Sequence, residues 1–491
     1  MSSFAAAMNA LSFTWNGAVS QATPDPSREY SGRISLLFKS VRGLDKKRLF
    51  DYLSEAAQEN LQDTIILCFH IRDCRGGKGE RNLGRQCLEW LRNNYPEEYT
   101  NVFQLIPTYG RWDDLLATDK QGYNLIADQL KTDIQDMSQG NPISLCAKWA
   151  PTEGDSLDRN HKTVNTLCTI LNISPKEYRK NYITPLRSYL KIVENFMCTG
   201  QWDQIEYEKV PSQAMRRLKN AFENHDADRF TEWKMGLEKG ESEVKGKQVS
   251  PHELVREIRT AGLADEVCEG QWKVLEEEVA KLGSLSDSVF VVDTYSNTYS
   301  SNSLHLDVAT SLGLLGCNAV EGPFHGHVIT FHDKPSFQII KDGTLTQRYQ
   351  QLSRIPWGGS TNIQATFDLI LERGKACNLT DKDMPKRLFI ISDLQLNLIQ
   401  YSTHDVKTNF EFIEQKYKSA GYIRPQVVFW NINGSSTDFP VTVDDQGTAL
   451  ISGFSPSIMK AVVNGNEITP ATILRDTIDD NRYDDIRNAL G

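Results

Sequence analysis

The chain has 491 residues, which is more than one hydrophobic core normally supports, because single domains usually stop growing at about 250–300 residues. Hydrophobic residues make up 39% of the sequence and charged residues 24%, a composition that argues against a disordered chain. The formal net charge of −10 excludes a general attraction to nucleic acid, so any such binding requires a local basic face.

The cysteines and the apolar runs bear on the compartment. Nine cysteines are scattered and form no CxxC pair, which indicates reduced thiols and not a disulfide framework. No apolar run reaches the roughly 18–20 residues that cross a bilayer, and the opening residues MSSFAAAMNALSF lack the basic segment of a signal peptide. We therefore expect a protein of the cytoplasm or a cytosol-like compartment, or of a larger particle, with no membrane partner.

The first part of the chain has a helical pattern. From about Leu44 to Leu282, apolar residues recur at spacings of three and four, as in GYNLIADQLKTDIQDM. The breaks are short and contain Gly or Pro, and Ser174-Pro175 is typical of a helix start. We therefore predict an α-helical array over residues 1–283, a solenoid or bundle that is closed or strongly curved. Within it, the charged and glycine-containing segment 234–250 is expected to be an exposed loop.

The period changes at residue 288. Short runs rich in β-branched and aromatic residues follow, and helical patterns separate them: SVFVVD (288–293), HVITFH (327–332), PSFQII (335–340), RLFIISD (387–393) and QVVFWNI (426–432). This alternation predicts an α/β domain over residues 284–491, with a doubly wound, mostly parallel sheet. PSFQII follows HVITFH so closely that we expect an antiparallel partner at the sheet edge.

Polar residues close two of the predicted strands. Asp293 ends one strand and Asp393 ends another, while Thr361 lies in the loop before the predicted helix that begins near Ile363. Ligands of open α/β sheets bind outside the carboxyl ends of the strands. Two carboxylates and a hydroxyl are the oxygen ligands that Mg²⁺ prefers, so the three residues predict a metal site and Mg²⁺ as the one candidate cofactor.

These segments resemble known families. VVDTYSNTYS, GGSTN and FIISDLQ, in that order, resemble the three loops of a von Willebrand factor A domain, which in that family form the metal-ion-dependent adhesion site. Upstream, RDCRGGKGERNLGRQ, LIPTYGRWDDLL and PHELVREI resemble an uncharacterised family that joins a TROVE-like helical module, as in the Ro RNA-binding autoantigens, to such a domain. The resemblance covers nearly the whole chain. It implies RNA binding by the helical array and protein contacts through the A-type domain.

The first metal loop departs from the family pattern. That pattern is Asp-x-Ser-x-Ser, but Asp293 is followed by Tyr295 and Asn297 at the two serine positions. A tyrosine ring would crowd a closely coordinated ion, so Mg²⁺ binding is expected to be weak or lost. In the alternative, the site is vestigial and its aspartates only hold loops and cap helices.

A local excess of basic residues lies at 157–220, with eleven Lys or Arg against six Asp or Glu. Basic side chains neutralise phosphates and aromatic rings stack on unpaired bases, so this segment, with Tyr178, Tyr182 and Tyr189 interleaved, suits single-stranded RNA. A solvated helical face is the alternative. The candidate RNA-binding residues are Arg159, Lys162, Lys176, Arg179, Lys180, Arg187, Lys191, Arg216, Arg217 and Lys219.

The segment RDCRGGKGER also concentrates positive charge around two glycines. Because the P-loop spacing is missing and no strand precedes it, a helix–helix connection with basic rims is favoured over a phosphate cradle. No catalytic motif is present, so an enzyme is not expected.

Two functions are consistent with these patterns. The first is a non-catalytic scaffold that binds RNA through the helical array and proteins through the A-type domain. The second is a structural or assembly protein of a larger particle, in which the degenerate metal-site surface is an interface with a protein partner or a second copy. Aromatic residues dominate such interfaces, and the anchors would be Tyr295, Tyr299 and Trp357.

Overall fold

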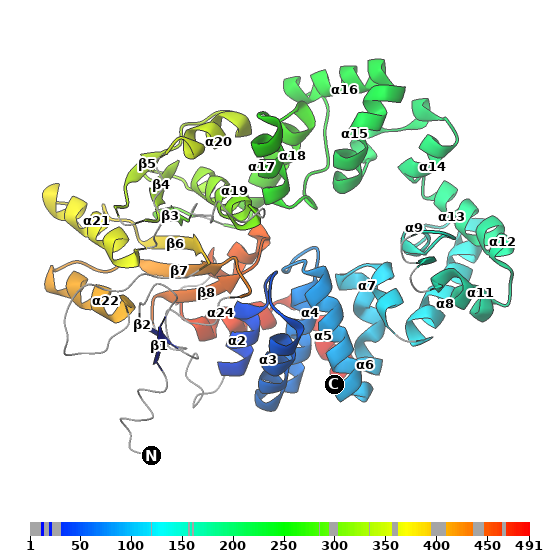
Figure 1. The fold of residues 1–491 in the computed structure, drawn as a ribbon, viewed down its shortest axis with the longest axis horizontal. Helices are drawn as coiled ribbons and strands as arrows, with labels where there is room; N and C mark the ends of the chain where they lie inside the picture. The colour runs from blue at the N-terminus through cyan, green and yellow to red at the C-terminus, as the bar shows by residue number, and fades with distance from the viewer. Residues whose placement is uncertain are drawn as a thin grey trace.

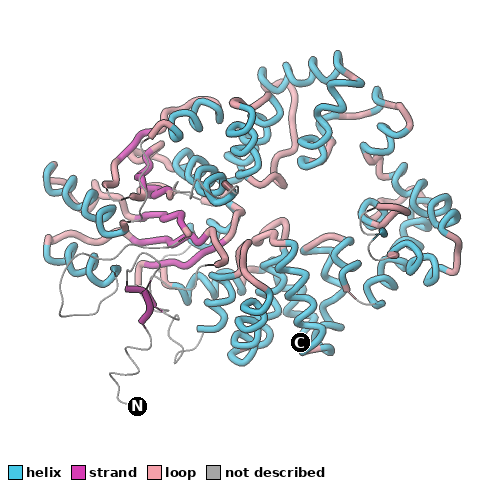
Figure 2. Tube along the Cα trace, in the orientation of Figure 1, coloured by secondary structure: helices cyan, strands magenta, loops and turns pink. Residues whose placement is uncertain are grey.

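The computed structural model describes residues 11–13, 19–21, 31–118, 120–155, 158–159, 162–283, 285–293, 303–332, 334–355, 362–393, 409–435, 446–463 and 468–491. These residues form a closed ring of helices into which one six-stranded sheet is built (Figure 1). The strands gather on one side of the ring and the remainder is helical (Figure 2).

The helical array begins with a group of short and medium-length helices. It comprises α2 (Ser31–Lys39), α3 (Lys46–Glu59), α4 (Leu61–Arg72), α5 (Arg81–Asn94), α6 (Pro96–Val102), η1 (Phe103–Leu105), α7 (Ile106–Tyr109) and η2 (Trp112–Ala117). Side chains cap two of the starts, because Asp45 accepts from the Arg48 amide and Asn60 from the Asp63 amide. A two-stranded antiparallel ladder, β1 (Leu11–Phe13) with β2 (Val19–Gln21), precedes them.

The array continues around the far side of the ring. It comprises α8 (Lys120–Ser138), α9 (Cys146–Trp149), α11 (Thr163–Leu171), α12 (Pro175–Tyr178), the π-helical turn η3 (Arg179–Ile183), α13 (Thr184–Tyr189) and α14 (Val193–Cys198). It returns to the sheet through η4 (Trp202–Gln204), η5 (Tyr207–Lys209), α15 (Ser212–His225), α16 (Ala227–Lys239), α17 (Pro251–Ala261) and α18 (Glu266–Ala280). The predicted start at Ser174 is confirmed, since Ser174 and Glu177 form a capping box.

The α/β domain contains the six-stranded sheet. Its elements are β3 (Ser288–Val292), α19 (Leu304–Ala319), β4 (His327–Thr330), β5 (Phe337–Ile339), α20 (Leu345–Ser353), α21 (Ile363–Ala376), β6 (Arg387–Ser392), α22 (Asn409–Ser419), β7 (Gln426–Asn431), β8 (Thr448–Ser452), η6 (Pro456–Met459), α23 (Lys460–Val463), α24 (Pro470–Ile478), η7 (Asn481–Tyr483) and α25 (Asp484–Leu490).

The strand order is β5-β4-β3-β6-β7-β8, and every pairing is parallel except that of β5 with β4. The chain runs outward from β3 in one direction and then from β6 in the other, which is the doubly wound arrangement. The five predicted strands and the antiparallel edge are confirmed, while β8 is an edge strand that the sequence pattern did not predict. The switch point lies between β3 and β6.

The two ends of the helical array both pack on the α/β domain. At one end, α2 contacts β8 and α24, and α25 contacts α4 and α6. At the other end, α17 and α18 contact α19. The helical array is therefore strongly curved, and the α/β domain closes it into a ring.

The hydrophobic cores do not follow the predicted division at 283/284. One cluster joins Ile65 of α4 and Leu474 of α24 to Val289 of β3, so the first helices share a core with one face of the sheet. A second cluster joins α17 and α18 to the opposite face, through residues such as Leu254 and Phe290. Secondary structure does change near the division, since α18 ends at Ala280 and β3 begins at Ser288, but the division itself stays a prediction.

The segment 234–250 differs from the predicted exposed loop. Helix α16 continues to Lys239, and the loop that follows buries Val244 and Val249 in two different cores. The segment has few apolar residues, which is why its sequence predicts an exposed loop. These few side chains are buried, however, and hold the segment in place. In the described part of the chain, no helix has the length and apolar character needed to span a bilayer.

A buried ion cluster fixes the joint between α17 and α19. Asp307 is fully buried and accepts from Arg256 Nε at 3.1 Å and from Arg259 Nε at 2.7 Å. Asp307→Ala is expected to lower the free energy of unfolding by about 1–3 kcal/mol, because it removes charge-assisted hydrogen bonds from two partly exposed guanidinium groups. Urea denaturation measures this, with Glu372→Ala on α21 as the exposed control; equal stability of the two variants would contradict the assignment.

Candidate functional site

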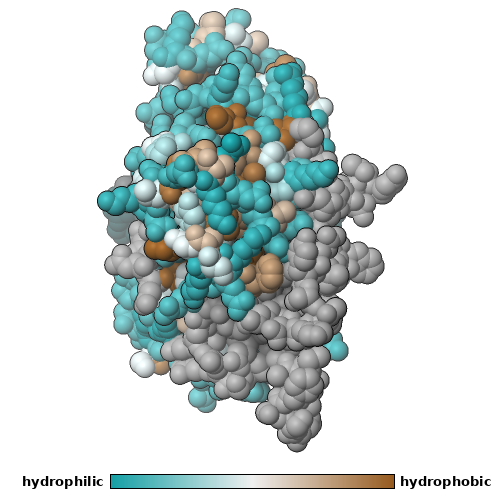
Figure 3. Space-filling view, turned by 90° about the vertical axis from the view of Figure 1, so that its left-hand side faces the viewer, coloured by the Kyte–Doolittle hydropathy of each residue, from teal (hydrophilic) through white to brown (hydrophobic). Residues whose placement is uncertain are grey.

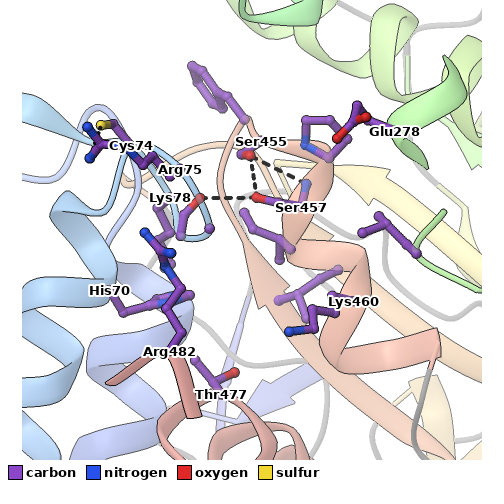
Figure 4. Close-up of a pocket in the computed structure, with 18 of the residues that line it drawn as sticks. His70, Cys74, Arg75, Lys78, Glu278, Ser455, Ser457, Lys460, Thr477 and Arg482 are labelled. Carbon is purple, nitrogen blue, oxygen red and sulfur yellow. Dashed lines mark hydrogen bonds between the residues drawn. The ribbon is translucent and has the colours of Figure 1, made fainter. Parts of the chain in front are cut away.

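A cavity of about 700 Å³ lies where the two ends of the ring meet, a volume typical of small-molecule pockets. Three segments line it: the loop between α4 and α5, residues 247–251 with the end of α18, and the stretch from β8 through η6 to η7. Figure 4 shows His70, Lys78 and Arg482 on one wall and Ser455, Ser457 and Lys460 on another. We refer to the contact between these segments as the seam.

Lys78 holds the centre of the seam. Its side chain is buried, and Nζ donates to the Leu37 carbonyl, to the Ser40 carbonyl at 3.0 Å and hydroxyl at 2.9 Å, and to the Ser452 hydroxyl at 2.7 Å. The carbonyl groups at the end of α2 lack intrahelical partners and carry partial negative charge, which favours a cation there. Burial lowers the pKa of Lys78 to about 7, against the charge of Glu80.

Two charged groups cross the seam beside Lys78. The Asp73 carboxylate is fully buried and accepts from Arg482 Nε and from Arg482 Nη2 at 2.7 Å. The Tyr109 hydroxyl donates to the Arg482 carbonyl at 2.8 Å. A residue in the first quarter of the chain is thereby paired with one near its end.

The loop RDCRGGKGER is the connection between α4 and α5, as predicted. Most of its amide groups are already committed: Arg75 and Gly76 donate to the Asp73 carboxylate, and the Lys78 amide donates to the His70 carbonyl. A Cβ at Gly77 would lie 2.2 Å from that same carbonyl oxygen, so a side chain does not fit there. This geometry does not offer a phosphate cradle.

Charges of both signs surround the cavity and most are paired. Lys460 pairs with Asp480 at 2.7 Å and Lys247 with Glu278 at 2.9 Å. The Ser455 and Ser457 hydroxyls lie 2.6 Å apart, and Ser457 Oγ donates to the Gly77 carbonyl. The lining of the cavity therefore favours neither anionic nor cationic ligands. The hydrogen bonds and ion pairs of the lining residues mainly join the three segments of the seam.

The predicted metal ligands Asp293 and Asp393 lie at the ends of β3 and β6, on either side of the switch point. Asp293 is buried and accepts from the Ser392 hydroxyl at 2.7 Å. Thr361 lies outside the described residues. Within the described ranges, no group of three candidate His, Cys, Asp or Glu ligands occurs, so the ligand set is incomplete there and Mg²⁺ stays a prediction.

The predicted interface residues Tyr295, Tyr299 and Trp357 also lie outside the described residues, so the interface stays a prediction. The face of the α/β domain turned toward the viewer in Figure 3 is mainly hydrophilic over the described surface, with scattered hydrophobic residues. Ile339 and Ile423 are among the exposed apolar side chains, at 60% and 73%.

The ten predicted RNA-binding residues separate into two sets. Three are committed to internal contacts: Arg187 donates to the Ala147 and Ala150 carbonyls, Arg216 contacts Glu253, and Lys219 lies between Glu257 and Asp265. The other seven are exposed: Arg159, Lys162, Lys176, Arg179, Lys180, Lys191 and Arg217. Arg217 lies on α15, beyond α14, and so apart from the others.

The interleaved tyrosines differ in the same way. Tyr178 is 1% exposed and its hydroxyl donates to the Pro151 carbonyl, so it belongs to the core and the prediction that it contacts RNA is wrong. Tyr182 is half-buried, while Tyr189 is 41% exposed. Burial on the inner face of α12 could not be seen from charge spacing alone.

We expect the seam to couple two residues that are distant in sequence. Asp73→Asn and Arg482→Met each remove one side of a buried ion pair, so a double-mutant cycle in urea should give a coupling of about 1–3 kcal/mol. The exposed pair Lys46 and Glu89, 2.7 Å apart, is the control and should give about 0.2–1 kcal/mol. A seam coupling no larger than that of the control would contradict closure through this pair.

Acid should weaken the seam through His70. Burial lowers the pKa of His70 to about 3, with the charge of Lys78 acting in the same direction, and its Nδ1 lies 2.9 Å from the Tyr483 hydroxyl. The unfolded chain binds the proton first, so stability is complete above pH about 6.5 and falls toward pH 3, by up to about 1.4 kcal/mol per pH unit. His70→Gln should flatten this slope in urea titrations from pH 7 to 4; an unchanged slope would count against it.

Comparison with known proteins gives three findings. Domains of unknown function match over two parts of the chain, DUF2828 at residues 171–285 and DUF7788 at residues 286–488. The uncharacterized protein L728 of Acanthamoeba polyphaga mimivirus is 32% identical over 512 residues, covering 94% of this chain and 86% of that protein. The crystal structure of the Deinococcus radiodurans Ro (RSR) protein aligns over 88% of this chain and 91% of that one, at 11% identity and a TM-score of 0.36.

Proposed function

This chain belongs to the family of the mimivirus protein L728, and we propose that it is a non-catalytic scaffold that binds single-stranded RNA through its helical array. The observation that carries the proposal is a set of exposed cations on and beside α11, α12, η3 and α13, which we name the basic surface. Its members are Lys162, Lys176, Arg179, Lys180 and Lys191.

The basic surface stands out from an acidic protein. Residues 162–191 contain six Lys or Arg and one acidic residue, Glu177. That carboxylate is occupied locally, because it accepts from the Ser174 amide and hydroxyl and closes the capping box. None of the five cations forms an ion pair with another described residue. Positive charge without an internal partner is available to phosphates.

The backbone of this segment is unusual as well. Lys162 and Lys191 both have a φ of +50°, in the left-handed region that residues other than glycine seldom adopt. Arg179 and Lys180 begin a π-helical turn, a feature that is frequent at functional sites. Such conformations persist only when the surrounding structure holds them, and here they position four of the five cations.

An exposed aromatic residue adds a stacking surface beside these charges. Tyr189 ends α13, two residues before Lys191, and its hydroxyl donates to the Asn141 carbonyl, which holds the ring at the surface. Cations that neutralise phosphates together with an exposed ring are the combination that binds unpaired nucleotides. This favours single-stranded RNA over a duplex, whose bases are stacked and unavailable.

Charge reversal on the basic surface tests the proposal. Lys176→Glu, Arg179→Glu and Lys180→Glu together should weaken binding of a labelled oligouridylate at least about tenfold, measured by fluorescence anisotropy over a range of salt concentrations. The slope of log K against log salt should fall by about 2, because each phosphate of a single strand that the protein no longer neutralises lowers it by about 0.7.

The control carries the same change in net charge on exposed lysines elsewhere: Lys239→Glu, Lys273→Glu and Lys375→Glu. These three form no ion pair with other described residues, so their replacement tests general electrostatics alone. Equal losses in the two variants, or no binding by the unaltered protein at low salt, would refute the proposal.

A further inference from the structure

A second group of cations lies next to α9, around the segment GRWDD. Two adjacent carboxylates, Asp113 and Asp114, are buried there. Four arginines converge on them: Arg72 and Arg85 on Asp114, and Arg81, Arg85 and Arg111 on Asp113. Four guanidinium groups thus share two carboxylates, which leaves an excess of two positive charges.

The excess charge is accessible on two of these side chains. Arg111 donates Nε to Asp113 Oδ1 at 2.9 Å and Nη2 to Oδ2 at 2.7 Å, while Arg81 donates only Nη2. A guanidinium carries five N–H groups, so several on each side chain have no partner among the described residues. The Arg81 side chain is 43% exposed and that of Arg111 is 28% exposed.

Lys148 is a third cation in this cluster, in addition to the accessible Arg81 and Arg111. The Arg111 guanidinium carbon lies 4.0 Å from the Trp149 ring centroid, and Lys148 Nζ lies 5.5 Å from the same centroid. Lys148 is partly buried and forms no ion pair with a described residue. Burial lowers the pKa of Lys148, and the charges of Lys245 and Arg111 act in the same direction, against Glu194.

Holding these positive charges close together is unfavourable in free energy. Burial also lowers the pKa of Arg81, and Arg85 and Arg111 contribute to that shift despite Asp113. An array whose cations repel one another and are partly removed from water is stabilised by an added anion, and guanidinium groups match the oxygens of phosphate in pairs.

We propose that Arg81, Arg111 and Lys148 form a phosphate-binding site, with Trp149 as its aromatic side. The ligand is a phosphate group, supplied either by a small phosphorylated molecule or by the backbone of RNA. A carboxylate ligand would neutralise only one of the excess positive charges. A phosphate carries up to two negative charges and offers more oxygen acceptors than a carboxylate such as Asp113.

The site is next to the basic surface but does not depend on it. Arg187 of α13 donates to the Ala147 and Ala150 carbonyls, and Arg111 lies over the Trp149 ring, so α9 contacts both α13 and the cluster. A strand of RNA would contact both groups of cations, whereas a small phosphate ligand would occupy the cluster alone.

Lys148→Met separates binding from folding. Because Lys148 forms no ion pair with a described residue and its charge is disfavoured by burial, this variant should melt at about the same temperature as the unaltered protein. Its affinity for inorganic pyrophosphate, measured by isothermal titration calorimetry at low salt, should fall about tenfold to a hundredfold. Lys239→Met, which removes one positive charge at an exposed position, should bind as the unaltered protein does.

Arg81→Gln provides a second test, since Asp113 keeps Arg85 and Arg111, and it should also weaken pyrophosphate binding. Unlabelled oligouridylate identifies the source of the phosphate: displacement of pyrophosphate points to RNA, and independent binding points to a small molecule. The variant with Lys176, Arg179 and Lys180 replaced should still bind pyrophosphate, so failure of either proposal is recognisable. Absence of saturable pyrophosphate binding, or unchanged affinity in Lys148→Met and Arg81→Gln, would overturn the site.

Discussion

The ammonium group of Lys78 joins the end of α2, the loop before α5 and the strand β8, and the closed form of the ring depends on that contact. The carbonyl groups at the end of α2 are covered by β8 and by the loop, so water cannot serve them. A cation with several donors satisfies them and the Ser452 hydroxyl together. Lys78 thereby ties α2 to the edge strand β8, and α24 contacts both α2 and α4 while α25 contacts α4.

A protein of net charge −10 can still present cationic surfaces, because its charges are unevenly distributed. Buried ion pairs neutralise charges of both signs, as in the contacts of Asp63 with Arg33 and Arg475 and of Asp307 with Arg259. Where cations outnumber acids locally, around Lys176 or Arg111, the surplus remains exposed. Net charge therefore describes the molecule poorly, because pairing decides which charges reach solvent.

Much of the α/β domain could be predicted from local patterns, and the ring closure could not. The strands around Val291 and Ile390 are continuous apolar runs, and Asp293 and Asp393 close them where the sheet order requires. By contrast, Asp73 and Arg482 are 409 residues apart, and no spacing connects them. The prediction that Arg187 and Lys219 face RNA came from a count of charges along the chain. Such a count does not show that Arg187 reaches carbonyl groups of α9, or that Lys219 reaches acidic residues of α17 and α18. Tyr178 shows the same limit for an aromatic residue.

The closure of the ring has a consequence for the order in which the molecule can form. Synthesis proceeds from the N-terminus, so α2 and α4 leave the ribosome long before β8, α24 and η7 exist. Until then, the apolar side chains of Phe38 and Ile65 have no sheet or C-terminal helix to cover them, and the buried carboxylate of Asp73 has no arginine. Transiently exposed apolar surface is what chaperones bind and what other nascent chains aggregate on. The N-terminal helices of this protein must therefore wait, incompletely folded, for the segments that complete their core.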